Sequence, residues 1–528
     1  MFANNQTKKW LISITALTLI PLLVFFAIYT LDFFFFGIRG EQVGYFSLFY
    51  KMSVDDARQI MGGMGEVIAA ILGIVITVAS IIVQLAATRY TPKITEMFFK
   101  DTKNLIVLAF FVITAIYCLL INFIIRGYTD NHALEFIPVL GAIMNVILLT
   151  ISILLIAPYF LYVFYFLEPG NIVKTLELQA LDKIKKLDNP EYIGNVQAKT
   201  ILSVEQLTDI SMNAIEQKDK GLATGSIDAL TDLLKDYSNF KSKLDKKWFQ
   251  IGSQIRNNPD FLSMHQEVLN DISKKRCWVE YKVLRQFQML YNESLNKMRD
   301  INYIIAINTR NVGEISISSK DTEILKLAIK FFNTYLRATL NAKDVRTAYN
   351  VLHQYRLFAE AVLRSGLDDQ VLEIANHFKY YGQIAFSMNI PFITETVAYD
   401  LTTLCELAFS AGAIVGDPLL DVLLEIDKEA EGEQQEQSLR GVRKAQVKMA
   451  TYFLLQGDDA RAHKIYKDMQ SEPPERIKSI RKELNSVKSK DFWEVIDRGE
   501  NFDYLNPERK HFLPVFFNKF SFVKEKSS

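Results

Sequence analysis

Four long apolar stretches near the N-terminus constrain the fold of this chain more than any other feature. They span residues 11–36, 67–87, 105–125 and 136–167, and only the first contains a charged residue, Asp32. The hydrocarbon core of a bilayer is about 30 Å thick, so a helix needs about 20 apolar residues to cross it. Each stretch is long enough, and together they predict four transmembrane helices. The first apolar run is too long for a secretory signal, so we interpret it as a retained span.

Charge separates these spans from the rest of the chain. The 528 residues carry 60 Lys and Arg and 60 Asp and Glu, but residues 1–170 hold only ten of each sign. The low density of charged residues over residues 1–170 predicts a transmembrane domain there and a water-soluble region after it. Because nucleic-acid binding requires a basic surface, the neutral balance argues against a nucleic-acid partner.

The positive charges of the loops predict the orientation of the spans. Ten Lys and Arg residues flank the predicted spans on one side of the membrane and four flank them on the other. Because the more positive loops of a membrane protein face the cytoplasm, the side with ten is expected to be cytoplasmic. The first group is Lys8, Lys9, Arg89, Lys93, Lys100, Lys103, Lys174, Lys183, Lys185 and Lys186; the second is Arg39, Lys51, Arg58 and Arg126. We therefore expect both termini in the cytoplasm.

The second span combines an apolar side with a line of small and polar residues. At about 100° per residue this line falls within an arc of about 140° on one helix face. Small residues allow helices to approach closely, and a polar side chain in hydrocarbon needs a partner. The face predicts helix packing within one subunit, or a subunit interface or pore formed by several copies. It comprises Gly65, Ala69, Gly73, Thr77, Ser80, Gln84 and Thr88. Asn145, in the fourth span, is interpreted as a helix-contact residue.

A resemblance appears around this span. Residues 54–58 (Val-Asp-Asp-Ala-Arg), 83–87 (Val-Gln-Leu-Ala-Ala), 90–93 (Tyr-Thr-Pro-Lys) and 98–101 (Phe-Phe-Lys-Asp) follow one another through residues 53–125. This pattern resembles the bacterial family of predicted membrane proteins catalogued as domain of unknown function 2254. Residues 204–230 resemble the family's helix–turn–helix more weakly. The resemblance implies a multi-pass bacterial inner-membrane protein and brings no functional residues with it.

The soluble region has a helical pattern throughout, which makes the predicted fold class all-α. We divide the region into a juxtamembrane helical domain, 171–320, and a helical-repeat-like domain, 321–528. Apolar side chains at helical spacing predict buried faces, for instance Leu325, Ile329, Phe332 and Leu336. Pro391 in front and Gly412 behind predict a helix over 392–410, and Gly366 predicts the end of a helix over 345–364.

One stretch has the spacing of a tetratricopeptide-like helix–turn–helix unit, in which small residues lie at the helix crossing and proline ends the unit. Its residues are Ala450, Phe453, Gly457, Ala462, Tyr466 and Pro474. We expect the aromatic cluster near the C-terminus, Phe492, Trp493, Phe502 and Tyr504, to dock onto the repeats while neighbouring carboxylates stay in solvent. The basic run from Lys241 to Lys247 favours a solvated helix face or a contact with anionic lipid.

No catalytic, cofactor-binding or metal-binding motif is present, and the three cysteines, Cys118, Cys277 and Cys405, lack the spacing of a zinc site or disulfide framework. We expect buried, reduced thiols. The leading hypothesis is a membrane-anchored sensory or interaction scaffold whose cytosolic repeats bind a protein partner. The alternative is an oligomeric ion channel lined by the second span; an enzyme is the least favoured class. Expected partners are membrane lipid, further copies of the chain and a cytosolic protein.

Overall fold

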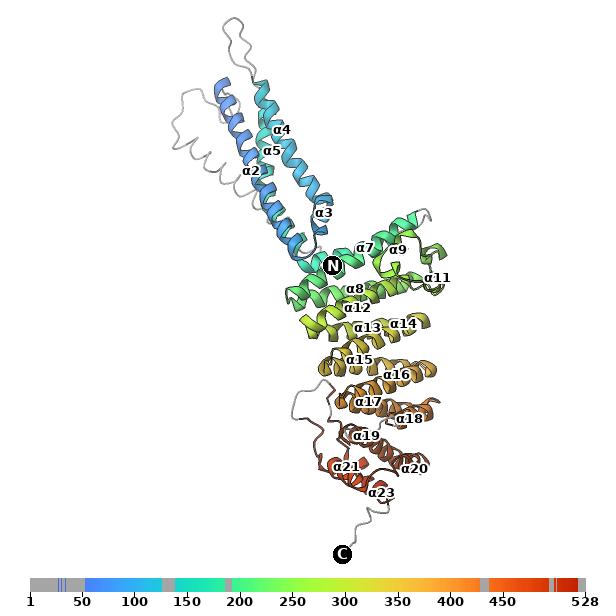
Figure 1. Ribbon diagram of the computed structural model, residues 1–528. Helices are drawn as coiled ribbons and strands as arrows, with labels where there is room; N and C mark the ends of the chain where they lie inside the picture. Colours follow the sequence, from blue (N-terminus) through green and yellow to red (C-terminus); the bar gives the residue numbers. More distant parts are fainter. Residues whose placement is uncertain are drawn as a thin grey trace. The chain divides into compact units, whose positions relative to one another are not determined.

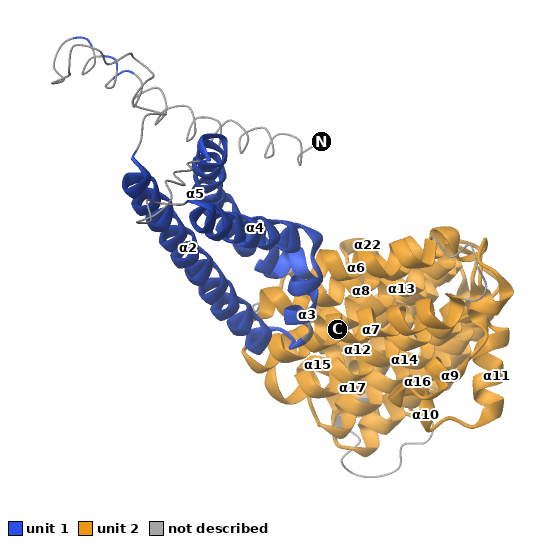
Figure 2. Cartoon of the chain, turned by 90° about the horizontal axis from the view of Figure 1, so that it is seen from above, with its two compact units in different colours: residues 1–172 blue, residues 173–528 orange. Residues whose placement is uncertain are grey.

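The computed structural model describes residues 53–125, 138–185, 192–427, 436–492, 498–499 and 501–520, with isolated positions at 27, 30 and 34. Within these ranges every regular element is a helix, as the sequence predicts. The chain divides into two compact units, residues 1–172 and 173–528, coloured separately in Figure 2. The predicted first span, residues 11–36, lies outside the described ranges apart from the three isolated positions.

The first unit contains the other three predicted spans. Its helices are α2 (Val54–Arg89), α3 (Lys93–Lys100), α4 (Thr102–Ile124) and α5 (Val139–Leu167). In the described part of the chain, α2, α4 and α5 are long and apolar enough to cross a membrane. Helix α2 is longer than the predicted span because it continues toward its N-terminus as far as the Ser53 cap, whose hydroxyl accepts a hydrogen bond from the Asp56 backbone nitrogen at 3.1 Å.

Helices α2, α4 and α5 pack on one another. Ala57 and Met61 of α2 meet Ile121 and Ile125 at the end of α4 in one buried apolar cluster. The short helix α3 is anchored by Phe98, which is buried and contacts the ring of Phe166 on α5 at 5.5 Å. The described membrane unit is therefore a three-helix assembly with a defined interior.

The second unit is built almost wholly from antiparallel helix pairs (Figure 1). After α6 (Pro169–Lys185) come α7 (Ile193–Glu216), α8 (Lys220–Lys241), the 3₁₀ turn η4 (Lys246–Phe249) and three short helices, α9 (Ser253–Arg256), α10 (Pro259–Leu262) and α11 (Gln266–Lys274). The long helices resume with α12 (Trp278–Lys297), α13 (Arg299–Ser318), α14 (Thr322–Asn341), α15 (Val345–Arg364), α16 (Asp368–Ser387) and α17 (Pro391–Ser410). The remainder comprises α18 (Gly416–Leu424), α19 (Glu436–Leu455), α20 (Asp459–Asp468), α21 (Pro474–Ser486), α22 (Pro507–Lys510) and α23 (Leu513–Phe517).

These helices form two layers. Helices α8, α13, α15, α17 and α19 each pack on the next, and we call them layer A. The second layer, which we call layer B, is formed in the same way by helices that each pack on the next: α7, α12, α14, α16 and α18. Successive helices alternate between the layers from α12 to α19, so each pair buries its apolar faces against its neighbours. Leu325, Ile329, Phe332 and Leu336 all lie in this core, as predicted.

A strict period runs through the middle of the unit. Helices α13 to α17 are each 20 residues long and begin at residues 299, 322, 345, 368 and 391, so consecutive helices begin 23 residues apart. The predicted helix 345–364 matches α15 residue for residue, and the predicted helix 392–410 matches α17 except that Pro391 is itself the first helical residue. The predicted domain boundary at residue 320 falls in the turn between α13 and α14. This turn has a residue with positive φ, Lys320, like the turns that follow it.

The turns explain how the period is kept. Each contains one residue in the left-handed region, with φ between 52° and 74°: Lys320, Lys343, Gly366, Asn389 and Gly412. In two of these turns the next residue is an aspartate that caps the following helix: Asp321 accepts from the Ile324 nitrogen and Asp344 from the Thr347 nitrogen. A three-residue turn of this kind reverses the chain directly into the next helix.

Candidate functional site

Most of the polar face predicted on α2 lies beside the arc that packs on α4 and α5, and not within it. Ala69, Gly73, Thr77, Gln84 and Thr88 are exposed in the single chain, and Gly65 and Ser80 are partly buried. The buried residues of α2, such as Ile68, Val75 and Val83, occupy the neighbouring arc of the helix, about 80° wide, which packs on α4 and α5. Packing against α4 and α5 therefore does not account for most of this face.

Other polar groups connect the membrane helices instead. Asn145 on α5 is fully buried, donates to the Met61 sulfur at 3.3 Å and accepts from the Cys118 thiol at 2.8 Å, which confirms it as a helix-contact residue. On α4, Asn104 accepts from the Tyr159 hydroxyl at 2.9 Å. Such pairs satisfy polar groups that water cannot reach. Cys118, Cys277 and Cys405 are all buried free thiols, as expected.

The tetratricopeptide-like residues lie in a helix–turn–helix made by α19 and α20. Ala450 and Phe453 are buried in α19, Ala462 is buried in α20, and Gly457 occupies the turn between them with φ of 75°. Tyr466 packs on Phe520 with ring centroids 4.8 Å apart, and Pro474 begins α21. These residues build the helix pair, and three of the six are buried.

Layer A carries an open groove near its beginning, between α8 and α13. We call it the α8–α13 groove; it has a volume of about 980 Å³. Exposed side chains such as Lys235 and Asn239 of α8 and Ser318 of α13 form its walls. At its edge Lys241 pairs with Glu280 at 2.7 Å and Asp321 at 2.8 Å. Lys241, from the predicted basic run, is thus a mostly buried ion-paired residue rather than a solvated or lipid-facing one.

Further along, layer A is covered by part of the chain's own C-terminal region. Phe502 stacks on Tyr399 of α17 with ring centroids 4.6 Å apart and also contacts Tyr349 of α15. Its carbonyl accepts from Lys448 of α19 at 2.6 Å. Residues 498–499 and 501–510, which we call the C-terminal strap, therefore contact α15, α17 and α19. Docking by Phe502 is confirmed, whereas Trp493 lies outside the described residues.

One carboxylate of this region departs from the expectation that it stays in solvent. Asp503 accepts from the Tyr399 hydroxyl at 2.5 Å and from the Lys444 ammonium at 2.7 Å. The prediction was wrong here because it considered only the strap itself. The partners that hold Asp503 are Lys444 of α19 and Tyr399 of α17, which lie 59 and 104 residues earlier in the chain, and no local pattern around Asp503 indicates them.

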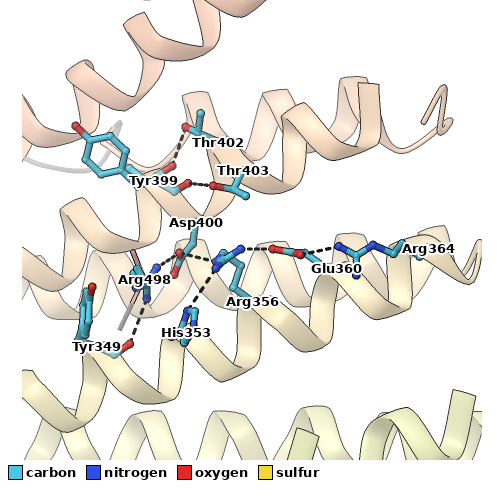
Figure 3. A network of polar contacts seen from close by, with 11 residues as sticks. Tyr349, His353, Arg356, Glu360, Arg364, Tyr399, Asp400, Thr402, Thr403 and Arg498 are labelled. Carbon is cyan, nitrogen blue, oxygen red and sulfur yellow. Dashed lines mark hydrogen bonds and ion pairs between the residues drawn. The ribbon is translucent and has the colours of Figure 1, made fainter. Parts of the chain in front are cut away.

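Beneath the strap lies a buried chain of charges (Figure 3). Arg498 of the strap and Arg356 of α15 both pair with Asp400 of α17, and Arg356 also pairs with Glu360. Glu360 in turn binds Arg364 at 2.9 Å. The Arg498 and Asp400 side chains are only 5% and 2% exposed. Arg498 also donates to the Tyr349 carbonyl at 3.2 Å and lies over the Tyr349 ring.

Burial and neighbouring charges shift the pKa values of two groups in this network, Asp400 and His353, in opposite directions. Desolvation raises the pKa of Asp400 above its ordinary value, against the effect of Arg498 and Arg356. Desolvation lowers the pKa of His353 to about 4, and the nearby guanidinium groups of Arg498, Arg356 and Arg310 add to the shift. His353 is therefore neutral at physiological pH, and the sequence pattern did not single out this network.

Together, the apolar helices of the first unit and the layered pairs of the second define a helical membrane protein with a helical-repeat-like region. Residues 6–222 match the family described as "Predicted membrane protein (DUF2254)", which confirms the resemblance and extends it beyond residues 53–125. A comparison with curated proteins finds no match. Among solved structures, the chain is similar to a "Circular tandem repeat protein with novel repeat topology and enhanced subunit contact surfaces". That likeness has 16% identity and a TM-score of 0.29 over 62% of this chain and 80% of the other.

Proposed function

We propose that this protein is a membrane-anchored, non-enzymatic interaction scaffold whose repeat unit binds a segment of a cytosolic protein along layer A. The observation that carries the proposal is that layer A holds the C-terminal strap at one end and borders the α8–α13 groove near the other. Helices α15, α17 and α19 hold the C-terminal strap through a stacked aromatic ring and ion pairs. The α8–α13 groove lies where α8 and α13 of the same layer meet the beginnings of α12 and α14.

The chemistry of the groove supports a polar partner segment of mixed charge. Its walls carry both signs, with Asp232 and Lys235 on α8 and Glu314 on α13, together with several hydroxyl and amide groups. Helical repeats offer extended surfaces suited to such segments. We place the protein in the bacterial inner membrane with both termini in the cytoplasm, which gives the repeats access to cytosolic partners.

Site-specific photocrosslinking in native membranes tests the proposal. A crosslinker at Lys235 or Ser318, in the groove walls, should give a discrete adduct with one protein, and one at Lys330, exposed on layer B, should not. The substitution Asn239→Trp should abolish the groove adduct by filling the groove, whereas Lys330→Trp should leave it intact. Equal labelling from both layers would contradict the proposal.

A second candidate function is an oligomeric channel, favoured by the exposure of the α2 polar face. A polar side chain such as Gln84 is costly against lipid, and a symmetric ring would turn it toward a shared axis. Light scattering in detergent should then give a closed oligomer, and liposomes should show ion flux that Gln84→Leu reduces. Ile74→Ala, at an exposed apolar position of the same helix, is the matched control. A monomer would eliminate this candidate.

A further inference from the structure

A separate cavity lies between the C-terminal strap and layer A, and it differs in charge from the α8–α13 groove. Its volume is about 410 Å³, and it is bounded by α15, α17, α19 and residues 498–509. This size is within the range of small-molecule sites. Four cationic side chains line it, Arg356, Lys448, Arg498 and Arg509, against two carboxylates, Asp400 and Glu406.

The excess of positive charge persists when the surrounding ion pairs are included. Glu360, which also contacts Arg356, is balanced by Arg364 at 2.9 Å. Lys444 pairs with Asp503 at 2.7 Å and also with Glu395 at 3.4 Å and Glu483 at 3.6 Å, and Glu483 pairs with Arg440 at 3.1 Å. These described neighbours carry one more negative than positive charge, which reduces but does not cancel the two extra positive charges of the cavity lining. Such a surplus in a partly buried site favours an anion.

Hydrogen-bonding capacity is also left over in this cavity. The Nε atoms of Arg498 and Arg509 are buried donors, and the Oδ2 atom of Asp400 is a buried acceptor. None of the three has a hydrogen-bond partner among the described residues. Buried guanidinium donors normally find an acceptor, and arginine suits the oxygen geometry of phosphate. Asp400 would accept from a hydroxyl on the same ligand.

We infer that this cavity binds a phosphate group, as free phosphate or as a small phosphate ester with hydroxyl groups, with Arg498 and Arg509 as its principal donors. The bound anion would bridge residues of the strap and residues of layer A, so binding would strengthen the attachment of the strap. This inference goes beyond the scaffold function and does not rest on it, because the groove that would hold a partner is a different part of layer A.

Calorimetry on the full chain in detergent tests the inference, with inorganic phosphate and glucose 6-phosphate as probes and glucose as the uncharged control. We expect saturable binding of at least one phosphate probe and none of glucose. Tighter binding of the ester would assign the site to phosphate esters, and tighter binding of the inorganic ion would assign it to free phosphate.

Two variants separate ligand binding from structural damage. Arg509 and Glu406 form one ion pair, with nitrogen–oxygen distances of 2.7 and 3.1 Å, so Arg509→Gln and Glu406→Gln both break it. If the cavity binds phosphate, Arg509→Gln should weaken binding by at least tenfold and Glu406→Gln should tighten it severalfold. The inference would be overturned if neither phosphate probe bound. It would also be overturned if both variants changed the affinity in the same direction, or if neither variant changed it.

Discussion

At the scale of single residues, packing in the repeat leaves little tolerance where helices of layer A meet. A Cβ atom at Gly313 of α13 would lie 2.4 to 3.0 Å from ring atoms of Phe358, which is fully buried on α15. The ring cannot turn away because the core around it is filled. Gly225 of α8 provides a contrast, since nothing lies within 4 Å of a Cβ added there.

We predict opposite effects of alanine at these two glycines. Gly313→Ala should lower the free energy of unfolding by about 1–3 kcal/mol because it overpacks the α13–α15 contact. Gly225→Ala should raise it by about 0.5–1 kcal/mol, since alanine is the better helix former. Chemical denaturation of the two variants measures both changes. A neutral Gly313→Ala would contradict the close approach of these helices.

The neutral state of His353 predicts a specific pH dependence. Its pKa is about 4 in the folded protein and about 6.5 in an unfolded chain. The unfolded chain therefore binds the proton more readily. Stability from the neutral ring is fully present above pH 6.5 and is lost as the pH falls toward 4. Asp427, whose pKa burial raises to about 6, acts in the opposite direction over an overlapping range.

Replacing His353 with glutamine should consequently reduce the loss of thermal stability between pH 7 and pH 5. The comparison with the unmodified chain cancels the contribution of Asp427, which is the same in both proteins. Melting temperatures at several pH values provide the measurement. If the two proteins lost stability in parallel, protonation of His353 would not be responsible for any of the acid sensitivity.

At the scale of elements, the turns of the repeat show why its period is hard to read from the sequence. The left-handed position is lysine at 320 and 343, glycine at 366 and 412, and asparagine at 389. Lysine can occupy that region at a cost of about 1 kcal/mol, so the geometry does not impose one residue type. Helices over 345–364 and 392–410 could be predicted because Gly366 follows the first and Pro391 and Gly412 flank the second.

Equivalent turns should respond to substitution according to this geometry. Lys343→Gly should stabilise the protein by up to about 1 kcal/mol, because glycine adopts the left-handed region without steric cost. Gly366→Val, one period later, should destabilise it by about 1–2 kcal/mol. Thermal unfolding of both variants tests the expectation. Similar effects at the two positions would show that the turns are not equivalent.

At the scale of the whole molecule, the second unit has its own core and lacks the apolar spans. Residues 173–528 are therefore expected to stay soluble without detergent and to unfold cooperatively on heating. A shorter fragment, 173–427, lacks α19 and would expose the layer A face of α17, so it should melt at a lower temperature. Circular dichroism of both fragments tests this, and a non-cooperative longer fragment would contradict it.

The sequence by itself determined which segments are apolar enough to span a membrane and that the rest is helical, because both follow from local composition and periodicity. It also located the polar face of α2, although not the direction in which that face points. Tertiary structure decided the features that join distant residues. Arg498 meets Asp400 across 98 positions, and Lys444 meets Asp503 across 59. Such pairs leave no local pattern in the sequence, since layer A brings their residues together only after its helices have packed.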